Sequence, residues 1–215
     1  VIPALFINAL PVSQLTNDKK MLITELLDAF YERFEKTTID MLLLDRGFFT
    51  KEVVEVLVKR KVPFIMPAVK NNRIKQLVKQ YEKGELPDKI KFRFGNVNVY
   101  LTFMKIEDEV FVFMTNTRKS PMNVHLLYKK RWQIETNFRE QNKYIFKTKT
   151  KNFTIRYLAF VLAGLIFNLW QMTRNKLVYK PESYLFKQFL KQELLCSWQT
   201  ISKRSVIKSV DYLLA

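Results

Sequence analysis

One stretch decides the fold: Ile39-Asp40-Met41-Leu42-Leu43-Leu44, followed directly by Asp45-Arg46-Gly47. Residues 39–44 are apolar except for Asp40, a pattern typical of a strand that is covered on both faces. The strand ends at a carboxylate that opens a glycine-containing turn. The sequence therefore predicts Asp45 at the end of a buried strand, although Asp is also common at such turns for purely structural reasons.

Strand and helix patterns alternate on both sides of this stretch. Strands are expected over 1–12, 62–67 and 89–116, and helices over 18–34, 50–58 and 71–83. This order predicts an α/β fold with a mixed sheet and right-handed crossovers. The alternating apolar residues of 89–116 indicate two or three antiparallel strands, which we interpret as a β insertion at about 88–117.

The second half of the chain is expected to be helical. A long helix is predicted over Pro121–Ile145, with one apolar stripe facing the core, formed by Leu127, Ile134, Phe138 and Ile145. A buried helix is predicted over 155–173, because its apolar run of 158–167 is about half the ~20 residues that span a bilayer. We therefore divide the chain into a core over 1–148 and a basic helical region over 149–215.

Composition narrows the chemistry. The chain has 37 Lys and Arg against 20 Asp and Glu, a formal charge of +17, so its surface attracts polyanions, foremost nucleic acid. The single Cys196 and the single His125 exclude a disulfide framework, a four-cysteine zinc site and most histidine catalysis. Carboxylates, Lys, Tyr and Ser remain. No signal peptide is evident, which indicates the cytoplasm.

Three residues of the predicted long helix project in similar directions: Tyr128, Arg131 and Glu135, at positions i, i+3 and i+7. A salt bridge between Arg131 and Glu135 on a solvated helix is the structural alternative. Together with Asp45, however, Glu135 suits two-metal phosphoryl chemistry, because Mg²⁺ prefers oxygen ligands and two such ions can act on one phosphate.

The runs Leu43–Phe49 and Tyr128–Glu135 resemble the motifs D-x-G-x-F/Y and Y-x2-R-x3-E-x6-K of DDE transposases of the insertion-sequence type. The resemblance covers about residues 1–170 and implies a ribonuclease H-like fold that transposes DNA. It also implies that Asp45 and Glu135 are the second and third catalytic acids and ligands of two Mg²⁺ or Mn²⁺ ions. Tyr128 and Arg131 would contact phosphates of the transposon end.

Two departures from the family pattern stand out. Asn142 replaces the expected Lys, and Lys143 follows one place later. The strand that carries the first Asp is missing, and neither the acids of the first helix nor Asp40 can replace it. The resemblance therefore implies an incomplete sheet and a chain that neither cleaves nor joins DNA by itself.

Basic and aromatic residues surround the proposed glutamate and are candidates for DNA contact: Lys129, Lys130, Trp132, Arg139, Lys143 and Lys147. The expected partners are transposon ends, target DNA and, in the intact enzyme, further copies of the chain. One alternative is a relic that only binds DNA. Another is a basic protein that meets an anionic membrane through the apolar helix.

Overall fold

The computed structural model describes residues 18–34, 39–176 and 182–197. The chain forms two compact units, one of residues 10–132 and the other of residues 133–215 with 1–9. The predicted core of residues 1–148 thus includes parts of both units. The strand predicted over 1–12 lies outside the described residues.

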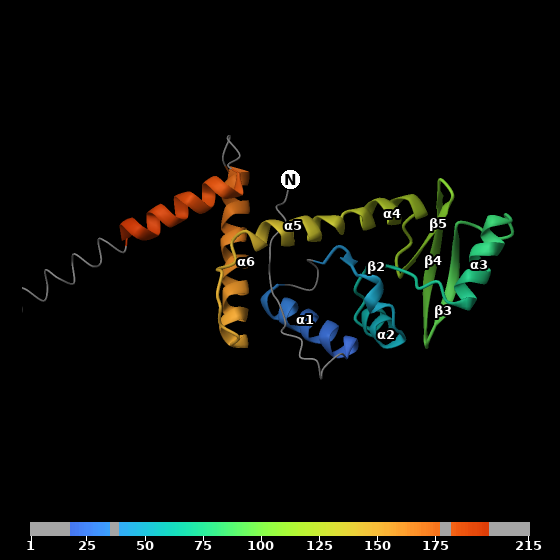
Figure 1. Ribbon diagram of the computed structural model, residues 1–215. Coiled ribbons are helices and arrows are strands. Elements are labelled where there is room, and N and C mark those ends of the chain that lie inside the picture. The colour runs from blue at the N-terminus through green and yellow to red at the C-terminus, as the bar shows by residue number, and fades with distance from the viewer. Residues whose placement is uncertain (1–17, 35–38, 177–181, 198–215) are drawn as a thin grey trace, which may run out of the picture. The chain divides into compact units, whose positions relative to one another are not determined.

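The first unit is built on one mixed sheet of five strands (Figure 1): β1 (Leu42–Leu43), β2 (Phe64–Pro67), β3 (Lys89–Phe94), β4 (Val97–Ile106) and β5 (Glu109–Thr115). The strand order is β1-β2-β5-β4-β3, with β1 and β2 parallel and the other pairs antiparallel. The three predicted antiparallel strands are confirmed. They continue the main sheet, because β5 pairs with β2, with Ile65 opposite Thr115.

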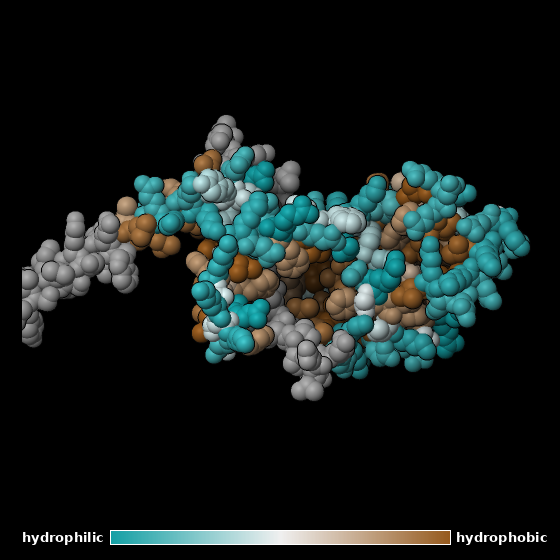
Figure 2. Space-filling model, in the orientation of Figure 1, coloured by the Kyte–Doolittle hydropathy of each residue, from teal (hydrophilic) through white to brown (hydrophobic). Residues whose placement is uncertain are grey.

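Four helices flank this sheet: α1 (Lys19–Arg33), α2 (Lys51–Lys59), α3 (Asn72–Glu82) and α4 (Pro121–Lys129). Each begins after a residue whose side chain accepts a hydrogen bond from the first turn, namely Asp18, Thr50, Asn71 and Ser120. The first three helices were predicted at these positions, and they are confirmed. The outer side of α3 is hydrophilic (Figure 2).

The two faces of the sheet carry two apolar clusters, because side chains alternate along each strand. Phe64 and Met66 pack with α1, α2 and α3, whereas Ile65 and Phe113 pack with α4. The unit thus has helices on both faces of one sheet.

The Asn116 side chain, just after β5, holds the backbone at the start of β2. Its Oδ1 accepts from the Phe64 N–H (3.1 Å), and its Nδ2 donates to the Val62 carbonyl (2.8 Å).

The strand expected over 39–44 is shorter and less buried than predicted. Only Leu42 and Leu43 lie in β1, and both are half-buried. Among the described residues β1 pairs with β2 alone, so it is an edge strand. A mainly apolar groove of about 720 Å³ lies beside it, lined by residues that include Leu26, Leu43 and Lys130. Apolar clusters nevertheless lie on both faces of this segment, with Leu42 and Leu44 in one and Met41 and Leu43 in the other, as expected. Among the described residues, it is the outer edge of the strand that has no neighbour.

The second unit is helical. It contains most of α5 (Trp132–Asn142), all of α6 (Phe153–Lys176) and a helix over 183–197. Its core is formed by Tyr144, Ala163, Phe167, Trp170 and Phe186. The Tyr144 hydroxyl donates to the Ser183 carbonyl at 3.3 Å, which joins the segment after α5 to the last described helix.

Helix α6 is where the sequence predicted a helix, but it is buried on one side only. Phe167 is 1% exposed, whereas Leu158 and Leu165 are 55% and 57% exposed. The expectation of a buried helix was wrong because α6 is apolar around most of its circumference, so the sequence does not mark the buried side. By length and composition, the 22 residues Phe153–Arg174 could also cross a membrane.

Candidate active site

The predicted catalytic residue Asp45 stands where β1 ends. The Leu44 N–H donates to the Ile65 carbonyl at 3.0 Å, and Asp45 then begins a short 3-10 turn, η2 (Arg46–Phe48). Its side chain makes no capping hydrogen bond to this turn and is exposed. The carboxylate is therefore fixed to the end of a strand and remains accessible to a cation.

Tyr128 of α4 reaches the same strand end. Its hydroxyl donates to the Leu44 carbonyl at 3.2 Å, and its ring lies 5.0 Å from that of Phe113. Burial raises the pKa of Tyr128, and the Asp45 carboxylate raises it further, whereas Arg131 and Arg46 act in the opposite direction. The structure thus brings together the aspartate motif and the beginning of the tyrosine motif, 84 residues apart in the chain.

The long helix predicted over Pro121–Ile145 is interrupted. Helix α4 ends at Lys129, and α5 begins at Trp132. In the turn between them, the Lys130 and Arg131 N–H groups donate to carbonyls three residues earlier, at 3.0 and 2.9 Å. Such spacing tightens the chain and ends the α-helical pattern. Tyr128 and Glu135 therefore do not share one helix, and the direction predicted from their spacing does not hold.

The break also changes the predicted apolar stripe. Ile134 and Phe138, which were expected to face the core, are 43% and 45% exposed. Leu127 and Ile145 are partly buried, each in a cluster of a different unit. The expectation was wrong because it treated the two helices as one continuous cylinder.

Arg131 lies among aromatic rings in the turn between the helices. Its Cζ is 5.7 Å from the centre of the Tyr128 ring and 5.9 Å from that of Trp132. Cations over aromatic faces at this range are attracted by the ring electrons. Trp132, one of the predicted DNA contacts, is 63% exposed.

Glu135 lies in the first turn of α5, in the second unit, and its side chain is exposed. An acidic residue in the first turn is stabilised by the helix dipole. Lys129 and Lys130 are exposed in the first unit, and Arg139 and Lys147 in the second. Each unit therefore presents one of the two proposed acids and some of the proposed DNA contacts.

Lys143 is engaged elsewhere. Its Nζ donates to both carboxylate oxygens of Glu140, at 2.7 and 2.8 Å, and to the Ser183 hydroxyl at 3.2 Å. These contacts belong to the packing of the second unit. They agree with the departure seen in the sequence, where Lys143 stands one place from the family position.

Sequence reasoning missed two features of this site. The contact between Tyr128 and the Leu44 carbonyl carries no sequence signal, because it depends on how α4 packs on the sheet. Arg46, which influences the pKa of Tyr128, could have been noticed as a cation directly after Asp45.

Oxygen donors of the two acids fit a hard cation such as Mg²⁺. In the part of the chain that the structure describes, no group of three or more His, Cys, Asp or Glu side chains could hold a metal ion. Asp45 therefore needs ligands beyond its own described neighbours to form a metal centre.

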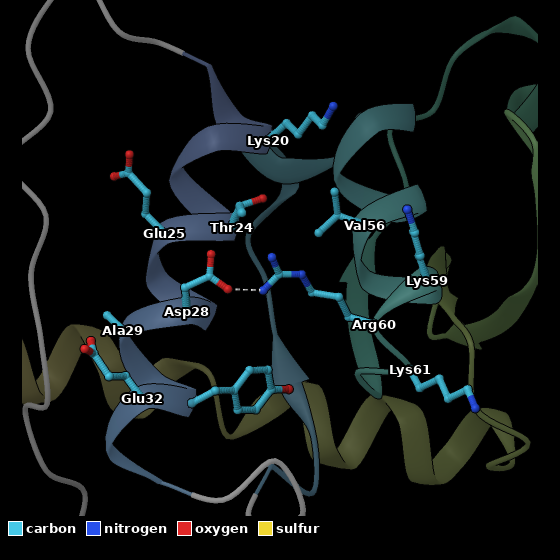
Figure 3. Close-up of a pocket in the computed structure, with 11 residues that line it drawn as sticks. Lys20, Thr24, Glu25, Asp28, Ala29, Glu32, Val56, Lys59, Arg60 and Lys61 are labelled. Carbon is cyan, nitrogen blue, oxygen red and sulfur yellow. Dashed lines mark hydrogen bonds and ion pairs between the residues drawn. The ribbon is translucent and has the colours of Figure 1, made fainter.

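A large groove of about 1260 Å³ lies elsewhere, between α1 and α2 (Figure 3). The Arg60 guanidinium crosses it to the Asp28 carboxylate, and further residues of both signs, among them Lys20 and Glu25, line it. No residue of either sequence motif lines this groove. We therefore place the candidate site at the end of β1.

Comparison with solved structures defines the class of fold. The structure is similar to one described as "Cryo-EM structure of piggyBac transposase synaptic complex with hairpin DNA", with a TM-score of 0.57 and 12% sequence identity. The match covers 82% of this chain and 40% of that one, so this chain spans less than half of that length. The expected mixed α/β fold of the ribonuclease H-like type, with C-terminal helices, is confirmed.

The family follows from the sequence comparison. The family described as "Transposase DDE domain" matches residues 4–169, and the chain belongs to it. Members of this family catalyse phosphoryl transfer on DNA and use divalent metal ions. No curated protein matches the chain. The resemblance stated from the two motifs is thus confirmed.

Proposed function

We propose that the chain carries two of the catalytic acids of a metal-dependent DNA transposase, Asp45 and Glu135. The observation that supports this most strongly is the hydrogen bond between Tyr128 and the Leu44 carbonyl (3.2 Å). It joins two motifs that are distant in sequence, at the end of a strand whose next residue is an accessible carboxylate.

The two acids would hold Mg²⁺ or Mn²⁺, two ions in the intact enzyme. Bound in this way, the ions would activate the attacking oxygen and stabilise the leaving oxygen of a phosphodiester. Lys129, Lys130 and Arg131 would hold the DNA backbone near Asp45, and Arg139 and Lys147 would add contacts from the second unit. Phosphate contacts of this kind position DNA without reading its sequence.

DNA is the proposed partner for two reasons. The charge of +17 favours a polyanion, and the similar piggyBac structure is described as a synaptic complex with hairpin DNA. Trp132, 63% exposed beside Arg131, offers a surface on which an unpaired base could stack. Assembly of several copies on DNA ends belongs to the same proposal.

We further propose that the described residues form an incomplete catalytic centre. Within the described ranges β1 pairs with β2 alone, and the apolar groove lies beside it. A further strand on this side would cover the groove and could bring the remaining carboxylate next to Asp45. A magnesium-dependent nicking assay on duplex DNA should show no turnover by this chain. Robust nicking that Asp45→Ala abolishes would contradict the proposal.

Binding of Mn²⁺, measured by calorimetry, tests the role of the two acids. Asp45→Asn and Glu135→Gln should each weaken binding at least several-fold, because each removes a charged ligand. Asp40→Asn and Glu52→Gln are the matched controls and should leave it unchanged; Glu52 is also an acid in the first turn of a helix. DNA binding without any effect of the two acids on Mn²⁺ would favour a relic that only binds DNA.

The apolar helix α6 favours a second candidate, a protein bound at a membrane surface. Cosedimentation with vesicles that contain anionic lipid separates the two. We expect little binding at physiological salt. Vesicle binding that Leu158→Asn and Leu165→Asn weaken together would support the membrane candidate instead.

A further inference from the structure

The peptide that precedes Asp45 is held from two sides. The Leu44 N–H donates to the Ile65 carbonyl at 3.0 Å, within the sheet. The Leu44 carbonyl accepts from the Tyr128 hydroxyl at 3.2 Å, from α4. Leu44 itself is 6% exposed, whereas Asp45 is exposed. Leu44 is therefore buried with its peptide groups hydrogen-bonded, and the next residue, Asp45, has an accessible side chain.

Tyr128 is itself held rigidly enough to act as a fixed donor. Its ring contacts Phe113, with ring centres 5.0 Å apart, and packs on the cluster of Ile65, Phe113 and Val124. The donor that fixes the Leu44 carbonyl is therefore positioned by the sheet.

This arrangement differs from the role that the family resemblance implied for Tyr128. A hydroxyl has one proton to donate. In the structure that proton goes to Leu44, so the hydroxyl cannot at the same time donate to a phosphate. Arg131, whose Cζ lies 5.7 Å from the centre of the ring, carries five N–H groups and is the stronger candidate for a phosphate contact.

We propose that Tyr128 is a positioning residue, whose bond to the Leu44 carbonyl sets the direction in which Asp45 leaves β1. The metal-binding part of this inference rests on the proposed role of Asp45. The role has a geometric basis, because a ligand must be held within a fraction of an ångström of its productive place. Without the bond, the last peptide of the strand would be fixed from the β2 side only.

The test compares two tyrosines with the same kind of bond. Tyr128→Phe removes the bond to Leu44, and Tyr144→Phe removes the bond from Tyr144 to the Ser183 carbonyl (3.3 Å) in the other unit. Phe fills the same space as Tyr, so both variants should fold, with similar small decreases in melting temperature. Thermal melts of the full chain provide this check.

Two readouts are made on the wild-type chain and on both variants. Hydrogen exchange of peptides that cover residues 45–48 should become about three- to tenfold faster in Tyr128→Phe, the factor that corresponds to one hydrogen bond. It should not change in Tyr144→Phe. Fe²⁺ used as a probe of the Mg²⁺ site, with ascorbate and peroxide, should cut the wild-type backbone near Asp45, and Tyr128→Phe should reduce this cut several-fold.

The readouts separate two failures. If wild type is cut near Asp45 and Tyr128→Phe is cut equally, with unchanged exchange, the positioning role is wrong although the metal site stands. If wild type is not cut there, the proposed role of Asp45 is wrong. In that second case, the hydrogen exchange of residues 45–48 alone decides whether Tyr128 fixes the end of β1. Equal effects of both tyrosine variants on the 45–48 segment would also overturn the inference.

Discussion

The turn that joins α4 to α5 allows a quantitative prediction about DNA binding. Lys129 and Lys130 are both exposed and stand next to Arg131, at the end of the helix whose Tyr128 contacts Leu44. We propose that each contacts a DNA phosphate. The perturbation is the double substitution Lys129→Gln and Lys130→Gln, which removes two charges and keeps the length of the side chains similar.

The magnitude follows from counterion release. Each phosphate contact contributes about 0.9 to the slope of log affinity against log salt concentration. Loss of two contacts should reduce the magnitude of that slope by about 1.8. Raising the salt from 50 to 200 mM lowers the affinity of both proteins, and the factor by which it falls should be roughly ten times smaller for the variant than for wild type.

The assay is fluorescence anisotropy of a labelled duplex at several salt concentrations. The matched control is Lys75→Gln with Lys79→Gln, two exposed lysines on α3 that lie outside both motifs. Loss of general surface charge would change both slopes equally. A slope that does not change in the Lys129 and Lys130 variant, or that changes as much in the control, would refute the reasoning.

Three further predictions concern stability. Asn116→Ala should lower the unfolding free energy of the first unit by about 2 kcal/mol or more, because it leaves the Phe64 N–H and the Val62 carbonyl, at the start of β2, without their partners. Asn98→Ala, at an exposed position of β4, should cost about 0.5 kcal/mol or less, and denaturant titration compares the two variants. Burial, with a smaller effect of Lys129, lowers the pKa of His125 below its ordinary 6.5, so the folded state prefers the neutral ring. The melting temperature should therefore be constant above pH 6.5 and fall below it. A melting temperature that rises on acidification would contradict this prediction. Phe167→Ala should lower the unfolding free energy by about 3 kcal/mol or more, since the Phe167 side chain is 1% exposed. Leu165→Ala should lower it by about 1 kcal/mol or less, since Leu165 is 57% exposed. Equal losses of stability in thermal melts would show that the burial of α6 is wrongly described.

Local signals in the sequence were sufficient for most elements of the first unit. Capping residues such as Asp18 and Thr50 mark where helices begin, and alternation marks β3, β4 and β5. These signals depend on neighbours within a few residues. The pairing of β5 with β2 could not be predicted in the same way, because it depends on contacts between distant parts of the chain.

The break between α4 and α5 is an instructive failure. The break falls at Lys130 and Arg131, and neither Gly nor Pro lies nearby, so no helix-breaking residue ends the helix there. We infer that tertiary contacts cause the break, because Tyr128 is held on the sheet by Phe113 and by the Leu44 carbonyl. Contacts of this kind override helix propensity.

At the candidate site, too, local signals in the sequence predicted some features and contacts between distant parts of the chain decided others. Motif spacing predicted Asp45 and Tyr128 as functional residues, and the structure brings them to the same strand end. It could not predict that the Tyr128 proton is donated to the backbone, because that depends on the distance between two folded elements. Likewise, Lys143 could be seen to stand out of place, but its bond to Glu140 required coordinates.

The central claim is that Asp45 and Glu135 share metal ions. A short thiol-specific cross-linker tests it directly in a chain with Cys196→Ser, which removes the one native cysteine. Asp45→Cys combined with Glu135→Cys should cross-link efficiently within one chain, because ligands of ions about 4 Å apart lie close together. Asp45→Cys combined with Gln133→Cys, an exposed position about 200° around α5 from residue 135, should cross-link much less. A chain in which residues 45 and 135 never cross-link, while the control pair does, would contradict the account.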